Sequence, residues 1–225
     1  MRTLLLTERI LDEIVSVVAQ SADGLETGVS LFGTNAGTDS RTDVVLAIAG
    51  PGRTATHEPA HYSADENHAA AIYCALRSAL PGIRWLGELH VHPRGMTWLS
   101  HGDLRTVRQI LTGTDATLHP DEFIAGVMQR RNGTVDIYPF HFTKKYLKGR
   151  EMELRISDSS APEIQEARQH AIQKGTEHDR PSVCTESRGS RAPREEARGN
   201  RWLRKWRECL GRYGRKVRDR ENHAR

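Results

Sequence analysis

Two histidines, a serine and an aspartate stand at fixed spacings in the stretch GELHVHPRGMTWLSHGDL. Side chains alternate between the two faces of a strand, so His90 and His92 point the same way. Pro93 ends the strand, which leaves both imidazoles at its terminus. Asp103 follows a plausible helix start at Ser100, close enough in the fold to complete three metal ligands. Two imidazoles and a carboxylate are a common catalytic zinc site, whose fourth position holds water.

Ser100 and Asp103 have a simpler explanation as a helix N-cap and its third residue, a variant of the capping box. Capping does not explain two histidines on one strand face. The string His-x-His-Pro, six residues, then Ser-x-x-Asp arises by chance on the order of once in ten thousand for this composition. We therefore interpret His90, His92 and Asp103 as ligands of one Zn²⁺ ion. Such an ion lowers the pKa of its water from about 15.7 toward roughly 7.

A second histidine pair, in HEPAH at residues 57–61, matches the HExxH signature of zinc proteases. That signature needs a helix to bring both histidines to one face. Pro59 removes a backbone donor inside the string and disfavours the helix. The longer form of the signature requires glycine and histidine where this chain has Ala64 and Asn67. We interpret HEPAH as a chance match within an irregular loop at 51–64.

Strand-like and helix-like patterns alternate around these residues. An amphipathic helix is expected near the N-terminus, where apolar residues recur at helical spacing, namely Ile10, Leu11, Ile14, Val17 and Val18. Strands are expected at 3–7, 27–33, 43–52, 83–91, 123–131 and 135–142, and helices at 64–80 and after Ser100. Several strands are hairpin neighbours, so we expect an α/β (mixed α+β) fold with a central mixed β-sheet flanked by helices.

The C-terminal part differs in composition from the rest. Residues 1–157 hold the expected core, and residues 158–200 are polar enough to predict a disordered linker. From residue 181 onward there are 14 Lys and Arg against 6 Asp and Glu, a net of +8, so the preceding part carries about −4. Within 201–220 the pattern predicts a basic amphipathic helix that could fold on an acidic partner, nucleic acid or a membrane surface.

Cysteine usage and the N-terminus bear on the compartment. Cys74, Cys184 and Cys209 are scattered and odd in number, which argues against a disulfide framework and favours a reducing compartment. Cys74, in an Ala-rich helix, fits a small buried side chain better than a nucleophile. The N-terminal apolar run is short and lacks a small-residue cleavage site, so no signal peptide is predicted. The expected location is the cytoplasm.

The spacing of the motif resembles the JAB/MPN metalloprotease family, the JAMM deubiquitinases. Their motif is an upstream Glu, then His-x-His, seven residues, Ser, two residues and Asp. ETGVSLFG, which begins at Glu26, matches the upstream form E-x-G-x-x-x-x-G. GELHVHP is similar to the GEWHTHP of bacterial members that accompany ubiquitin-like conjugation systems in antiviral operons. Val91 departs from the Ser or Thr common there, but its side chain should face away from the metal.

The resemblance implies a cytidine-deaminase-like JAB/MPN fold over 1–157 and a role for each motif residue. Glu26 would take a proton from zinc-bound water and deliver one to the leaving amine. Ser100 would hydrogen-bond the developing oxyanion. Glu88 shares the strand face of His90 by parity. It is therefore a rival base, or a hydrogen-bond partner that orients an imidazole.

The resemblance also implies a substrate and partners. The protein would process or deconjugate a bacterial ubiquitin-like protein after its C-terminal glycine, in antiphage defence, alongside E1-like and E2-like enzymes. The tail of the substrate would enter extended and add a strand beside the sheet. Loops at 94–99 and 112–122 would shape the channel, with Met96 and Trp98 as its apolar wall. The insertion at 51–66 would grip the ubiquitin-like partner.

Two other functions are consistent with parts of the sequence. A non-catalytic MPN-type scaffold would keep the fold and assemble complexes, although scaffolding relatives usually lack the ligands that are present here. A nucleic-acid-binding protein would act through the basic tail. Deletion of the tail would abolish its effect, and mutation of the metal ligands would not.

Overall fold

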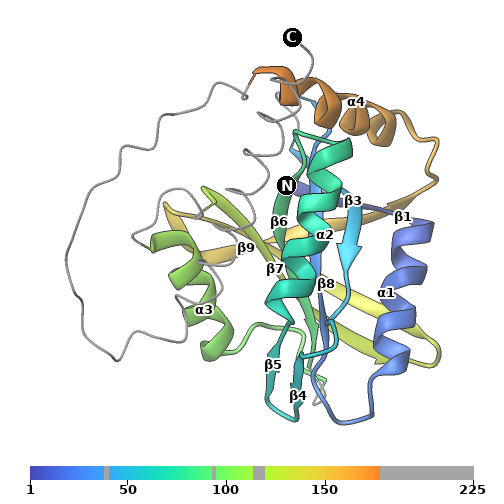
Figure 1. Cartoon of the computed structure of the whole chain (residues 1–225). Coiled ribbons are helices and arrows are strands. Elements are labelled where there is room, and N and C mark those ends of the chain that lie inside the picture. The colour runs from blue at the N-terminus through green and yellow to red at the C-terminus, as the bar shows by residue number, and fades with distance from the viewer. Residues whose placement is uncertain (38–40, 93–94, 114–119, 178–225) are drawn as a thin grey trace.

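The computed structural model describes residues 1–37, 41–92, 95–113 and 120–177. In chain order its elements are β1 (Arg2–Thr7), α1 (Glu8–Gln20), β2 (Gly28–Asn35), β3 (Thr42–Ala49), β4 (Thr56–Glu58), β5 (His61–Ser63), α2 (Glu66–Ala79), β6 (Arg84–Val91), α3 (His101–Thr112), β7 (Glu122–Arg131), β8 (Thr134–Thr143), β9 (Tyr146–Ser157) and α4 (Pro162–Glu177). In Figure 1 the β4–β5 hairpin and α4 lie at opposite ends of the molecule.

The strands other than β4 and β5 form one closed barrel in the order β1-β3-β2-β6-β7-β8-β9. The barrel is mixed, because β1 pairs in parallel with β3 and β9, and β6 pairs in parallel with β7, whereas the other pairs are antiparallel. The predicted mixed sheet with helices is therefore confirmed. The closure through β1 and β9 was not predicted.

The N-terminal helix fits the predicted apolar pattern. The Thr7 side chain accepts a hydrogen bond from the backbone N–H of Ile10 and caps α1. Ile10, Ile14 and Val18 are buried, and they join strand residues of the barrel in the largest apolar cluster. The predicted amphipathic helix is confirmed in position and in the face that it buries.

Two predictions about loops and linkers are wrong. Residues 51–64 contain the β4–β5 hairpin, because Thr56–Glu58 and His61–Ser63 pair across a turn that contains Pro59. The linker predicted at 158–200 begins with α4, which packs against β2 and β3 and buries Ile164, Ala167 and Ala171. The core therefore extends beyond residue 157. The remainder of the predicted linker, and the 201–220 helix, lie outside the described residues.

The prediction that HEPAH does not form a helix is confirmed. His57 lies in β4 and His61 in β5, one residue out of direct register, so the string does not present two histidines on one helix face.

Among the described helices, none has the length and apolarity needed to cross a bilayer. Cys74, which was predicted to be a small buried side chain, lies on α2 and is half-buried.

Candidate metal centre

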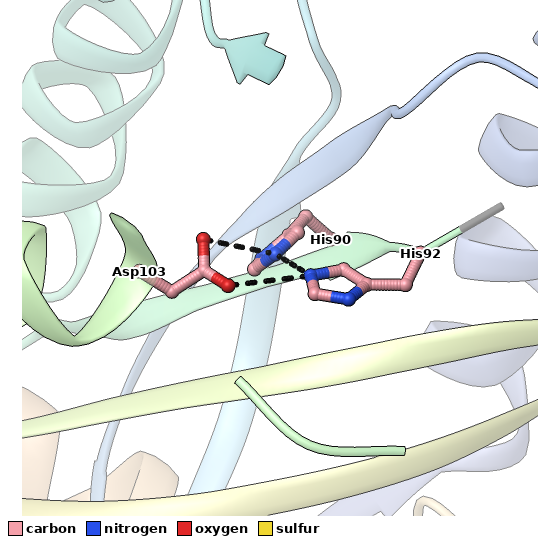
Figure 2. A group of neighbouring side chains, drawn as sticks. All are labelled: His90, His92 and Asp103. Carbon is pink, nitrogen blue, oxygen red and sulfur yellow. Dashed lines mark hydrogen bonds and ion pairs between the residues drawn. The ribbon is translucent and has the colours of Figure 1, made fainter. Parts of the chain in front are cut away.

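The two histidines of the motif lie at the end of β6, held between β2 and β7. His90 stands opposite Gly28 on β2 and beside Val127 on β7. The ladder continues beyond β6, since the backbone N–H of His92 donates to the carbonyl of Met128 at 3.2 Å. Backbone pairing fixes the direction in which both side chains leave the strand, on both sides at His90 and on the β7 side at His92. The Nε2 atoms of the two imidazoles lie 2.7 Å apart (Figure 2).

Asp103 reaches the histidines from the first turn of α3. Its Oδ1 lies 3.4 Å from the Nε2 of His90, and its Oδ2 lies 3.3 Å from the Nε2 of His92 (Figure 2). The same residue completes a capping box, because its Oδ2 accepts from the N–H of Ser100 at 2.7 Å and its own N–H donates to Ser100 Oγ at 3.2 Å. Capping and the approach to the histidines, treated as alternatives above, occur together.

The electrostatics of this cluster favour an anionic Asp103. Burial alone would raise the pKa of Asp103. Hydrogen bonds from His90 and His92, their charge, and the hydrogen bond from Ser100 outweigh it and hold that pKa far below its usual range. The carboxylate is thus ionised at neutral pH.

The donor set fits a divalent cation. The ligand atoms of His90, His92 and Asp103 all lie within 4.8 Å of one another. Ligand atoms about 2.0–2.1 Å from a tetrahedral ion are about 3.3 Å apart, which agrees with both nitrogen–oxygen distances, whereas the two Nε2 atoms, 2.7 Å apart, lie closer together than this. Imidazole and carboxylate ligands suit several divalent metals, zinc among them. The sequence prediction that these three side chains converge is confirmed.

Glu26 lies beside the cluster, two residues before β2. Because Gly28 is paired with His90 in an antiparallel ladder, Glu26 falls opposite His92 when the register is continued. Burial raises the pKa of Glu26, His90 and His92 lower it, and Asp103 raises it. The net effect is a raised pKa, and the charges of all three candidate ligands act on the carboxyl group of Glu26.

Glu88 occupies a different environment on the same strand. Ser30 Oγ donates to its Oε1 at 3.4 Å. Burial raises the pKa of Glu88, while His90 and the hydrogen bond from Ser30 lower it and Glu66 raises it. Among the three candidate ligands only His90 influences Glu88 in this way.

The remaining predicted residues are Ser100, Met96, Trp98 and the loop at 112–122. Ser100 Oγ accepts from Asp103, which leaves its hydroxyl proton available for another acceptor. Met96 and Trp98, in the connection from β6 to α3, are 44% and 60% exposed, and the Trp98 ring packs 5.4 Å from that of Phe140. The predicted loop at 112–122 lies largely outside the described residues.

The contacts that side chains of the β4–β5 hairpin make with the segment of Glu26 were not predicted from the sequence. The Nδ1 atom of His57 lies 3.0 Å from the backbone oxygen of Glu26, and Tyr62 donates its hydroxyl hydrogen bond to the carbonyl of Gly28 at 3.1 Å. THE and HYS are short, and the Pro59–Ala60 turn between them is not one of the two-residue turns that signal a hairpin, so the sequence carried little signal for this element.

Comparison with known proteins finds a similar fold but gives no indication of function. No protein-family model matches the chain, and no curated protein matches it significantly. A similar solved structure is the solution structure of protein DSY2949 from Desulfitobacterium hafniense, with a TM-score of 0.51 and 18% sequence identity over 69% of this chain and 93% of that one. At this identity the similarity concerns the fold alone.

Proposed function

We propose that this protein is a zinc-dependent peptidase or isopeptidase that cleaves after the C-terminal glycine of a ubiquitin-like protein. The observation that carries the proposal is the convergence of His90 and His92 from β6 with Asp103 from α3, beside the carboxyl group of Glu26. This arrangement supports a metal-dependent hydrolase. The zinc ion, the JAB/MPN fold family, the ubiquitin-like substrate and the role in antiphage defence are supported by the motif resemblance.

The residues of the chain would divide the chemistry among them. A zinc ion held by the three ligands would supply a Lewis acid and lower the pKa of a water toward about 7. Glu26 would accept a proton from the attacking water and pass one to the leaving amine. The hydroxyl group of Ser100 would donate a hydrogen bond to the developing oxyanion.

The closed barrel restricts where an extended substrate tail could add a strand. Every barrel strand has a partner strand on each side, and among the described residues the strands without a second partner strand are those of the β4–β5 hairpin. β4 already bonds the backbone of Glu26 through the carbonyl of Glu58. We therefore expect the tail to pair with β5 rather than with a barrel strand, with exposed Met96 and Trp98 available for its apolar side chains.

Paired substitutions of two neighbouring acids test the proposal. The substrate is a peptide that ends in glycine joined to a fluorogenic amine, and bound zinc is measured by atomic spectroscopy. Glu26→Gln should retain about one zinc per chain and lose about 10²- to 10⁴-fold in kcat, the range for general acid–base catalysis. Glu88→Gln, the matched control, should lose far less.

Each contrary result has a definite meaning. Equal activity of Glu26→Gln and the wild type would refute the assignment of the base. A larger loss in Glu88→Gln would transfer that role to Glu88. Wild-type protein that binds no zinc when purified without chelator would contradict the metal-dependent reaction and favour a non-catalytic scaffold.

A further inference from the structure

Glu26 belongs to a short segment that the barrel holds on one side only. On the β6 side, the N–H of Val91 donates to the carbonyl of Thr27 at 2.7 Å, and Gly28 pairs with His90. On the other side, the pairing of β2 with β3 reaches only to Ser30 opposite Ala49. The backbone at 26–28 therefore extends beyond the end of β3.

The β4–β5 hairpin occupies the side where β3 has ended. The N–H of Glu26 donates to the carbonyl of Glu58 at 2.9 Å. His57 Nδ1 lies 3.0 Å from the carbonyl oxygen of Glu26. A carbonyl only accepts hydrogen bonds, so Nδ1 of His57 must carry the proton. The peptide groups on both sides of Glu26 are thus bonded to β4.

Tyr62 attaches the same hairpin to the first residue of β2. Its hydroxyl donates to the carbonyl of Gly28, and an added Cβ on Gly28 would lie 2.6 Å from Tyr62 Cε1 and 2.6 Å from the carbonyl oxygen of Leu89. Only glycine leaves room for the Tyr62 ring here. The Tyr62 ring lies 5.8 Å from that of His57, so the two side chains approach the segment as neighbours.

We propose that the β4–β5 hairpin is a positioning element for the proposed base, in which His57 and Tyr62 hold the backbone of Glu26 against the strand that carries His90 and His92. This inference rests on the proposed function, since it gives HEPAH a role in the reaction without making His57 a ligand. His57 acts through Glu26 and is a positioning residue. If the backbone at 26–28 were hydrogen-bonded to β6 alone, the segment could move, and the carboxyl group of Glu26 with it, away from the candidate ligands.

Amide hydrogen exchange tests the positioning without relying on catalysis. His57→Ala should speed exchange of the Glu26 N–H by about 2- to 10-fold, the effect of losing one neighbouring hydrogen bond. The N–H of Val91, on the β6 side of the same segment, should exchange as in the wild type. His57→Asn, which can place an amide donor near the Nδ1 position, should restore protection. Unchanged exchange of the Glu26 N–H in His57→Ala would overturn the inference.

Kinetics with the glycine-terminated fluorogenic peptide then test its consequence. His57→Ala should lower kcat by about 2- to 10-fold with KM and bound zinc unchanged. Tyr62→Phe, which keeps the ring, should act in the same direction, and exposed His68→Ala should have no effect. In a Glu26→Gln background, His57→Ala should cause no further loss.

The outcomes separate the two proposals. If His57→Ala lowers kcat by the same factor in the Glu26→Gln background as in the wild type, His57 does not act through Glu26, and the inference is overturned. Faster exchange in His57→Ala, combined with a wild-type protein that binds zinc but cleaves nothing, would support the positioning and contradict the proposed reaction.

Discussion

Asp103 has two structural relationships that mutation can separate, one with the helix cap and one with the histidines. Its Oδ2 accepts from the N–H of Ser100 at 2.7 Å and lies 3.3 Å from the Nε2 of His92. Asp103→Asn keeps an acceptor oxygen for the cap and removes the anionic ligand. Ser100→Ala removes the other half of the cap and leaves the carboxylate. Ser100→Ala should therefore weaken the helix cap and keep metal binding, whereas Asp103→Asn should keep the cap and weaken metal binding.

The expected magnitudes follow from the contacts. Loss of a capping side chain costs about 0.5–2 kcal/mol, so Ser100→Ala should lower the Tm of the metal-free protein by about 1–8 °C for a folded part of this size. Asp103→Asn keeps the cap but loses its charge at the helix N-terminus. Loss of that charge at the helix terminus should cost about 0.3–1 kcal/mol, or about 1–4 °C, to which the loss of its contacts with His90 and His92 adds.

Zinc should raise the Tm of Ser100→Ala far more than the Tm of Asp103→Asn. At a free zinc concentration 100 times the wild-type Kd, binding stabilises the fold by about 2.7 kcal/mol, which raises Tm by about 5–11 °C. Ser100→Ala should keep this rise. If loss of the carboxylate weakens binding about 100-fold, the stabilisation in Asp103→Asn falls to about 0.4 kcal/mol, or about 1–2 °C.

The assay is thermal unfolding of the three proteins in chelator and in buffered zinc, with binding measured separately by calorimetry. A full zinc-induced rise in Asp103→Asn would refute the assignment of Asp103 as a ligand. A rise lost in Ser100→Ala but kept in Asp103→Asn would show that the zinc response arises elsewhere.

Two further predictions concern the barrel. Ile164 on α4 is fully buried against the barrel, so Ile164→Ala should lower the free energy of unfolding by about 2–5 kcal/mol, and a change under 0.5 kcal/mol in denaturant titrations would contradict the packing of α4. Burial and Arg2 lower the pKa of His141 in spite of Glu122 and Asp43, so folding disfavours its protonated form. The stability that neutral His141 contributes is present above its ordinary pKa of about 6.5 and is lost as pH falls through the lowered value. His141→Gln should therefore show a shallower fall of Tm between neutral and acidic pH, and an unchanged slope would contradict this account.

The local parts of the site could be predicted because each has a short-range cause. Alternation along one strand puts His90 and His92 on the same face, and capping fixes where α3 begins. Asp103 then follows within a single turn. These relationships span a few residues, so the sequence carries them directly.

The closure of the barrel has no comparable local signal. β1 and β9 pair in parallel from Arg2 opposite Met152 to Thr7 opposite Ser157, which joins strands at opposite ends of the described core. Either strand alone is compatible with an open sheet. The pairing depends on the arrangement of all the strands between them, which periodicity does not encode.

α4 was missed for a different reason. Its sequence is mostly polar, and the side chains that it buries include two alanines, Ala167 and Ala171, besides Ile164. Small side chains let the helix approach closely, and the N–H of Gly82 donates to the carbonyl of Ala171 at 2.6 Å. A hydrophobicity pattern gives alanine little weight, although close packing here depends on its small size.

The three candidate ligands bring together more polar contacts than a single proton can serve. The Nε2 atoms of His90 and His92 lie 2.7 Å apart, so a hydrogen bond between them requires exactly one proton on that line. Each nitrogen also lies 3.3–3.4 Å from an oxygen of Asp103, which only accepts hydrogen bonds when ionised. One proton can serve one of these three contacts at a time, whereas a divalent cation would attract both nitrogens and the carboxylate together. Zinc and protons compete for the same ligand atoms, so the affinity for zinc should weaken as the pH is lowered.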